Sequence, residues 1–279
     1  MMPNNRAGSH NVPILRTFLS ERDRKILDLV RAHRLVTTRQ LQRLLFHDHA
    51  TVESGTRACN RVLTRLRERR FLERLERPVG GIRGGSGSYV WMLGPAGDRV
   101  TRHASSPTTR TREIEPGQLF LTHTLAITET RALLEEAART EPLEVLSVTT
   151  EPTNWRTYLG RVGAKQTLKP DLEVVTATAD YEDHWFFEID QGTESIPTLI
   201  RKCLGYEHYR ATGTEQARRG VFPFVVWIIA EPRRRAALEA AISANDRLDA
   251  RLFRVVHPDE LIALVAATPE AGAVTGATS

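Results

Sequence analysis

Two short stretches decide the fold of this chain: KPDLEVV at residues 169–175 and WFFEID at residues 185–190. Both are apolar runs of strand length, rich in β-branched or aromatic residues, so we expect two neighbouring buried strands. Each carries a carboxylate, Asp171 in the first stretch and Glu188 in the second. An ionisable residue among buried aromatic side chains needs a cationic partner or a metal ion. The pair therefore predicts an acidic site between two strands, and Mg²⁺ is the metal that such a site would take.

The segments around these strands alternate between helix and strand. Three consecutive strands joined by tight turns, followed by a crossover helix, indicate a mixed sheet flanked by helices. We therefore expect an α/β (α+β) fold with the element order αβββαβ in this half of the chain. The expected helices cover residues 119–139, 196–211 and 232–244, and the expected strands cover residues 143–149, 171–177, 184–189, 222–230 and 252–256.

The N-terminal third predicts three helices followed by a hairpin. The helices are expected at residues 20–33, 37–46 and 55–70, because capping residues precede apolar residues at helical spacing. Two apolar strands, at residues 71–75 and 88–93, then enclose a Gly-rich run, which is typical of a β-hairpin wing. This order of elements predicts a winged helix-turn-helix.

The third helix has a polar face suited to contact with DNA. Arginine can bridge O6 and N7 of guanine, and asparagine can read N6 and N7 of adenine, while threonine and further arginines anchor phosphates. A solvated polar face is the alternative interpretation, but this helix precedes a wing and lies in a basic region. The residues expected to contact DNA are Arg57, Asn60, Arg61, Thr64 and Arg65, with Arg83 at the wing tip against the minor groove or a phosphate.

The net charge of +5 hides an asymmetry between the two halves. Residues 1–112 hold 22 Lys and Arg against 9 Asp and Glu, a net +13, whereas residues 113–279 hold 17 against 25, a net −8. A basic domain favours a polyanionic partner because each neutralised phosphate releases condensed counterions. A GC-rich genome would explain why arginine outnumbers lysine, but not why the excess lies in one half. The expected partner is double-stranded DNA.

The length of 279 residues predicts two domains. We place the winged helix at residues 14–103, a linker at 104–118, the α/β domain at 119–266 and a disordered tail at 267–279. The sequence shows no apolar stretch of about 18 residues and no signal peptide, so we expect a cytoplasmic protein without membrane contact. Cys59 and Cys203 are expected to be two reduced core thiols.

The C-terminal half resembles the core of the PD-(D/E)XK nucleases. The resemblance rests on the αβββαβ order, on Pro170-Asp171 at the second strand and on Glu188-x-Asp190 at the third. With the winged helix, the sequence FEIDQGTE at 187–194, Arg201-Lys202 and Tyr206-x-x-Tyr209, residues 20–262 are similar to the replication-relaxation family of actinobacterial and mobile-element proteins. That similarity implies a DNA-binding protein linked to plasmid or mobile-element replication and to DNA relaxation.

Catalysis by a nuclease core of this kind needs two carboxylates on Mg²⁺ and a lysine near the scissile phosphate. Asp171 and Glu188 match the two metal-ligand positions of the family pattern. Asp190 stands where that pattern has lysine, on the same side of the strand as Glu188, and so reverses the charge. A structural role for Asp190 at the end of the strand is the alternative interpretation.

A lysine could reach this site from elsewhere in the fold. Lys202 on the following helix is the leading candidate and Lys169 the weaker one, although Lys202 could also lie on a solvated helix face. Glu129 matches an acidic position that some members of the nuclease superfamily carry on the preceding helix. Tyr206 and Tyr209 suggest a relaxase-type nucleophile, but core or helix-face tyrosines are the better interpretation because a histidine cluster is missing.

Two functions remain open. The first is a regulator or accessory factor in plasmid or mobile-element DNA replication and relaxation, which requires no cofactor and whose nuclease-like domain lacks the standard catalytic lysine. The alternative is a Mg²⁺-dependent endonuclease that uses Asp171 and Glu188 with a relocated lysine such as Lys202. A homodimer formed through the C-terminal domain is a further hypothesis. No Gly-rich loop ending in GK[ST] is present, so we expect no nucleotide cofactor.

Overall fold

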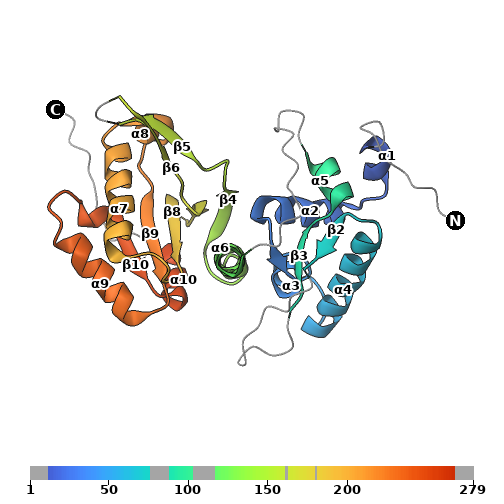
Figure 1. Cartoon of the computed structure of the whole chain (residues 1–279). Coiled ribbons are helices and arrows are strands. Elements are labelled where there is room, and N and C mark those ends of the chain that lie inside the picture. Colours follow the sequence, from blue (N-terminus) through green and yellow to red (C-terminus); the bar gives the residue numbers. More distant parts are fainter. Residues whose placement is uncertain (1–11, 76–87, 103–116, 161–162, 180, 268–279) are drawn as a thin grey trace. The chain divides into compact units, whose positions relative to one another are not determined.

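The computed structural model describes residues 12–75, 88–102, 117–160, 163–179 and 181–267 (Figure 1). The chain forms two compact units, Met1–Ala132 and Leu133–Ser279, and combines helices with a mixed β-sheet. The predicted α/β (α+β) class is therefore confirmed. Within the described ranges, no helix has both the length and the apolar character needed to cross a membrane.

The N-terminal unit is built mainly from helices. Its elements are α1 (Val12–Thr17), α2 (Glu21–His33), β1 (Val36–Thr37), α3 (Thr38–Leu45), α4 (Val52–Glu68), β2 (Leu72–Arg74), β3 (Val90–Leu93), α5 (Pro95–Thr101) and most of α6 (Gln118–Ala137). Capping boxes at Ser20 and Thr37 begin α2 and α3, as the sequence predicts. Helix α4 begins three residues earlier than predicted, because Thr51 forms a capping box with Ser54.

This unit also holds a three-stranded antiparallel sheet in the order β1-β3-β2. Strands β2 and β3 are the two predicted strands, and Leu72 pairs with Leu93. The sequence does not predict β1, which is only two residues long and pairs Val36 with Trp91. The Gly-rich run between β2 and β3, with Arg83, lies outside the described residues.

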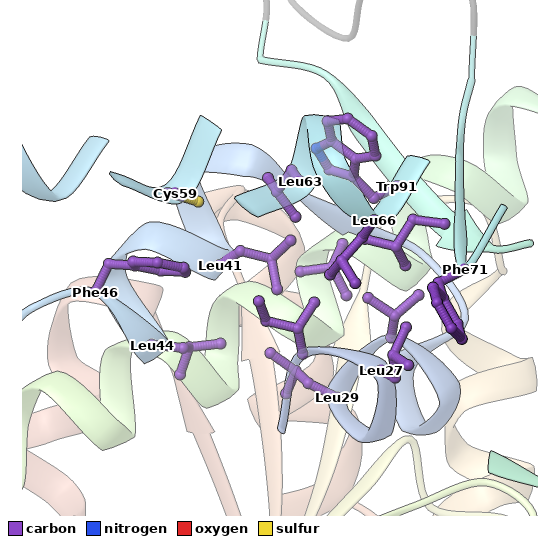
Figure 2. Packing of buried hydrophobic residues seen from close by; sticks show 14 of the residues in the cluster. Leu27, Leu29, Leu41, Leu44, Phe46, Cys59, Leu63, Leu66, Phe71 and Trp91 are labelled. Atoms are coloured by element: carbon purple, nitrogen blue, oxygen red, sulfur yellow. The ribbon is translucent and has the colours of Figure 1, made fainter. Parts of the chain in front are cut away.

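One hydrophobic core joins the helices of this unit to its sheet. Figure 2 shows Leu27 of α2, Leu41 of α3 and Leu63 of α4 together in this core, and all three are fully buried. The Trp91 indole donates a 2.8 Å hydrogen bond to the Thr38 hydroxyl. Cys59 lies in the same core as a free thiol, as predicted, and burial raises its pKa to about 12.

Helix α6 packs on the N-terminal unit for most of its length. Leu121 and Leu125 are buried in a cluster with Leu35 and Val90, and the Thr128 hydroxyl donates a 3.3 Å hydrogen bond to the Leu35 carbonyl. The sequence instead predicts α6 as the first element of the C-terminal domain. The difference arises because the apolar stripe of α6 packs against Leu35 and Val90 of the N-terminal unit.

The C-terminal unit holds a five-stranded mixed sheet in the order β10-β9-β8-β7-β4. Strands β8, β9 and β10 run parallel, and β7 is antiparallel to both β8 and β4. The predicted elements are present as β4 (Glu144–Thr150), β7 (Leu172–Ala177), β8 (Glu182–Asp190), α7 (Ile196–Arg210), β9 (Phe224–Ile229), α9 (Pro232–Ser243) and β10 (Phe253–Val256).

Several elements of this unit are not predicted by the sequence. They are a separate two-stranded hairpin, β5 (Arg156–Leu159) and β6 (Lys165–Leu168), a short helix α8 (Thr214–Arg219), the 3₁₀ turns η2 (Ala250–Leu252) and η3 (Pro258–Glu260), and α10 (Leu261–Ala266). Figure 1 shows the hairpin within the C-terminal unit, near α8. The hairpin strands are only four residues long, and Arg156 stands at an inner position where an alternating strand would carry an apolar residue, so no strand pattern stands out.

Helix α7 covers one face of the large sheet. Leu199, Cys203 and Tyr206 of this helix are fully buried in one cluster with Phe186 of β8 and Trp227 of β9. This is the face on which Glu188 lies, because residues 186 and 188 point to the same side of β8. The predicted buried thiol at Cys203 is confirmed.

Candidate functional site

The acidic pair lies where β7 begins and β8 ends. The register pairs Leu172 with Phe187, which places Asp171 opposite Glu188 on the same face of the sheet. The backbone of Asp171 donates a 3.1 Å hydrogen bond to the Phe187 carbonyl. Its carboxylate accepts a 2.7 Å bond from the Ile189 amide. These bonds fix Asp171 to β8 beside Glu188, as the sequence predicts.

Glu188 is buried and has two polar partners on α7. Its side chain is 4% exposed, and it accepts a 2.5 Å hydrogen bond from the Tyr206 hydroxyl. The Lys202 ammonium lies 3.8 Å from the other carboxylate oxygen. Residues 202 and 206 are four apart, so they share one face of the helix. The helix therefore brings a cation and a hydroxyl to the same buried carboxylate.

Burial makes Glu188 a weak acid. Desolvation, with the negative charge of Asp171 adding to it, raises the pKa of the Glu188 carboxyl to about 8. The Lys202 charge and the Tyr206 hydrogen bond oppose this rise without cancelling it. Glu188 is consequently mostly protonated at neutral pH.

Lys202 keeps its charge in this setting. Burial opposes the charged form, but the carboxylates of Glu188 and Glu194 outweigh it and raise the pKa of Lys202. The ammonium forms a 2.7 Å ion pair with Glu194 and lies 5.9 Å from the centre of the Trp227 ring. Of the two lysines proposed from the sequence, Lys202 is the one that the structure brings to Glu188. Lys169 instead lies over Trp155, at 4.2 Å from the ring centre.

Asp190, the last residue of β8, is held by an arginine. Arg234, at the start of α9, donates hydrogen bonds from Nε and Nη2 to the two carboxylate oxygens of Asp190. It also donates a 2.5 Å bond to the Glu194 carbonyl. The Asp190 side chain is only 3% exposed. This bidentate pair ties β8 to α9. Asp190 does end its strand, but the next helix, α7, is capped by Ser195.

Glu129 has its partners within the N-terminal unit. Its carboxylate accepts a 3.0 Å hydrogen bond from the Gln40 amide and forms an ion pair with Arg43. The prediction that Glu129 belongs to the acidic site is therefore not supported by its observed contacts. The match rested on sequence position alone, and the side chain lies on the part of α6 that packs against α3.

The two tyrosines of α7 are core residues, as predicted. Tyr206 is fully buried and donates to Glu188, and Tyr209 donates a 2.6 Å hydrogen bond to Glu215. Burial and these carboxylates raise the pKa of both phenols. A phenol that is buried and difficult to ionise is poorly suited to attack a phosphate.

Two residues of this site are not predicted as partners by the sequence, Tyr206 for Glu188 and Arg234 for Asp190. The spacing of Tyr206 four residues after Lys202 is the one signal that could have linked it to the acidic pair. Arg234 lies in a run of three arginines, and nothing in that run distinguishes it from its neighbours.

The acidic pair suits Mg²⁺ by its chemistry. Mg²⁺ is commonly bound by one or two carboxylates together with water and phosphate oxygens. Asp171 and Glu188 face each other across β7 and β8, and a divalent cation between them would stabilise their charged forms. Across the described residues, no group of three or more His, Cys, Asp or Glu side chains is arranged to hold a metal ion. Asp171 and Glu188 would thus be the protein ligands, with no third carboxylate.

Helix α4 exposes the polar face expected to contact DNA. Arg57, Asn60, Arg61 and Thr64 are all exposed, whereas Cys59, Leu63 and Leu66 on the opposite side are buried. Arg65 is half-exposed but engaged, since its guanidinium pairs with the buried carboxylate of Asp23 in α2. Arg65, one of the residues predicted to contact DNA, thus has a structural role in joining α4 to α2.

Comparison with known proteins gives one family. A model described as replication-relaxation matches residues 27–225, which is more than half of the chain. The protein has the mixed α/β fold and the charged site described above. Because the family model covers most of the chain, the protein belongs to the replication-relaxation family. Membership indicates a role in the replication or relaxation of mobile elements. No curated protein and no solved structure matched the chain.

Proposed function

We propose that this protein binds double-stranded DNA through α4 and acts in the cytoplasm as a regulator or accessory factor of mobile-element replication and relaxation. The observation that carries the proposal is the exposed face of α4, where Arg57, Asn60, Arg61 and Thr64 lie opposite the buried stripe. The net charge of +13 on residues 1–112 supports a polyanionic partner. Membership of a replication-relaxation family supports DNA as that polyanion.

The order of elements supports a winged helix. Helices α2, α3 and α4 are followed by the antiparallel pair β2–β3, and β1 completes the sheet. In helix-turn-helix proteins, the recognition helix lies in the major groove while the preceding helix crosses the backbone. Helix α4 holds that place in the order of elements. It is 17 residues long and capped at Thr51, so it presents its polar face on a regular helix.

Removal of the α4 arginines is expected to weaken duplex binding. A variant carrying Arg57→Ala and Arg61→Ala loses two groups that can bind base edges or phosphates. We expect the affinity for duplex DNA to fall about 10- to 100-fold, and the slope of log affinity against log salt to fall by about 1–2. Fluorescence anisotropy with a labelled duplex at several salt concentrations measures both quantities.

Arg24→Ala is the matched control. Arg24 is an exposed arginine of the same unit that lies on α2, so its removal changes net charge without altering α4. The control should keep both the affinity and the salt slope close to those of the wild type. Equal affinities for the wild type and the α4 double variant would contradict the proposal.

A second candidate function is a Mg²⁺-dependent endonuclease. One observation favours it: the Lys202 ammonium lies 3.8 Å from the carboxylate of Glu188, so a cation is present although Asp190 occupies the usual lysine position. Asp171 and Glu188 would hold the Mg²⁺ ion, which when bound polarises a phosphate oxygen. Lys202 would place its positive charge near the phosphate on which negative charge develops. Because Glu188 is mostly protonated at neutral pH, metal binding would release its proton and strengthen as pH rises.

The endonuclease candidate predicts that nicking of supercoiled plasmid depends on both the acidic pair and Lys202. With Mg²⁺ or Mn²⁺ present, we expect Glu188→Ala to abolish nicking and Lys202→Met to slow it about 100-fold, because charge stabilisation at the phosphate is lost. The rate of conversion from supercoiled to open-circular DNA on a gel gives the measurement.

Lys25→Met serves as the matched lysine control, since Lys25 pairs with Glu21 on α2 in the other unit. It should nick at the wild-type rate. If the wild-type protein nicks no substrate with either metal, the endonuclease candidate is rejected and the regulator remains.

A further inference from the structure

The hairpin β5–β6 has an outer face that no function described so far uses. The register pairs Thr157 with Thr167 and Leu159 with Lys165, and its extension places Trp155 beside Lys169. Alternate residues of a strand point to the same side, so these six side chains share one face. All of them are exposed.

The inner face of the hairpin is fixed to the rest of the C-terminal unit. Tyr158 and Leu168 are buried in the core cluster under α7, and the Tyr158 hydroxyl donates a 3.2 Å hydrogen bond to the Gly205 carbonyl. The amide of Asn154 donates a 2.6 Å bond to the Pro170 carbonyl. The outer face is therefore held on a rigid support.

Arg156 adds a buried ionic anchor to this support. Its guanidinium donates a 2.6 Å bond to Glu173 of β7 and a 2.9 Å bond to Glu215 of α8. Arg219 of α8 also pairs with both of these carboxylates. The hairpin is thus bound to β7, the strand whose first residue, Leu172, follows Asp171.

The charge of this segment differs from that of its surroundings. Residues 152–170 contain four basic residues and no Asp or Glu, although residues 113–279 together carry a net charge of −8. Arg156 is neutralised in the interior, but Lys165 and Lys169 are exposed on the outer face. These are two of the four lysines in the chain. A local excess of positive charge on an acidic unit favours an anionic partner.

The outer face also carries the one accessible indole of the chain. Trp155 is 38% exposed, whereas Trp91, Trp185 and Trp227 are at most 4% exposed. Lys169 lies over the Trp155 ring, at 4.2 Å from its centre, and Lys165 lies at the other end of the same face. An exposed aromatic ring on a basic face is a combination with which proteins bind single-stranded nucleic acid, because bases stack on the ring while ammonium groups contact phosphates. A base paired within a duplex has both faces stacked and cannot stack on such a ring.

We propose that the outer face of the β5–β6 hairpin binds single-stranded DNA, with a base stacked on Trp155 and phosphates on Lys165 and Lys169. This function is separate from the duplex contact proposed for α4. The chain runs from Lys169 through Pro170 directly into Asp171. The outer face of the hairpin thus ends two residues before Asp171 in the chain.

Tryptophan fluorescence of the full chain tests the stacking contact. Addition of an oligonucleotide of about 15 thymidines is expected to quench the emission, since Trp155 alone among the four indoles is accessible for stacking. Trp155→Phe should abolish the quenching but retain most of the affinity, because a phenyl ring still stacks. Trp155→Ala should lower the affinity for the oligonucleotide about tenfold. Quenching that survives in Trp155→Phe would overturn the assignment of Trp155.

A double variant, Lys165→Gln with Lys169→Gln, tests the phosphate contacts. Loss of two contacts should lower the slope of log affinity against log salt by about 1.4 for the single strand, at about 0.7 per phosphate. The affinity for a duplex of the same length should stay unchanged. The α4 double variant should show the opposite pattern, with the duplex affinity reduced and the quenching by the single strand retained.

Lys25→Gln provides the matched control for the loss of lysine charge, and circular dichroism spectra check that each variant is folded. Unchanged binding of the single strand by the Lys165/Lys169 variant would overturn the proposal. An equal loss of affinity for single strand and duplex would also overturn it, since the hairpin would then contact any DNA backbone. Neither result bears on the α4 proposal, so the two can fail separately.

Discussion

Replacement of Arg156 by methionine is expected to lower the free energy of unfolding of the C-terminal unit by about 3–5 kcal/mol, the usual cost of removing one partner from a buried ion pair. Arg156 is 7% exposed and bonds to two buried carboxylates, Glu173 and Glu215. The variant would leave these carboxylates without their central cation, although Arg219 still pairs with both. Urea unfolding followed by tryptophan fluorescence gives the measurement, because three of the four indoles lie in this unit.

Arg251→Met is the matched control for this prediction. Arg251 pairs with Asp249 in the same unit, but its side chain is 82% exposed. The loss of an exposed pair of this kind should change the free energy of unfolding by less than about 1 kcal/mol. The loss in free energy of unfolding for Arg156→Lys should lie between those for Arg156→Met and Arg251→Met. Lysine keeps the charge but lacks the planar guanidinium that bonds to both carboxylates. If Arg156→Met were no more destabilising than Arg251→Met, the buried cluster would not be an anchor of the hairpin.

The regular elements of both units could be predicted because their signals are local. The capping boxes at Ser20 and Thr37 begin helices where the sequence places them, and the apolar runs at β7, β8 and β9 become the central strands. Asp171 and Glu188 could also be placed together, because the meander of two adjacent strands leaves few possible registers.

The partners of these carboxylates could be predicted only in part. Lys202 was accessible from the sequence because a helix must cross over the sheet after β8. The Arg234 pair with Asp190 joins residues that are 44 positions apart, and the Arg156 pair with Glu215 joins residues 59 positions apart. No local sequence pattern predicts contacts between residues so far apart, and the five arginines between residues 211 and 235 look alike in the sequence. The hairpin itself is short, and its buried arginine breaks the apolar alternation by which strands are recognised.

The role of Asp190 shows how position in a motif differs from role in a structure. A carboxylate in the place of a catalytic lysine suggests a lost active site. In this fold, Arg234 neutralises Asp190, while the charge of Lys202 reaches Glu188 from α7. The net arrangement is still a pair of carboxylates beside a cation. The replaced lysine by itself therefore does not decide between a regulator and an endonuclease, and the plasmid-nicking measurement does.

Glu188→Gln is expected to make the C-terminal unit more stable at pH 8 and to remove a loss of stability that the wild type shows as pH rises. The folded-state pKa of Glu188, about 8, lies above its ordinary value of 4.5. Between these values the folded state holds a proton that the unfolded state has released. The free energy of unfolding therefore falls as pH rises from about 4.5 to about 8, by on the order of 4 kcal/mol from this group alone.

Urea unfolding at intervals from pH 5 to pH 9, in the presence of EDTA, measures this contribution as the difference between the variant and the wild type. The difference is needed because other groups act in the opposite direction. Burial lowers the pKa of His33 to about 3, so that side chain costs stability as pH falls below about 6.5, equally in both proteins. Glutamine can still accept the hydrogen bond from Tyr206 and carries no charge to desolvate. A difference that stays constant from pH 5 to pH 9 would show that Glu188 ionises normally, and that Lys202 and Tyr206 compensate fully for its burial.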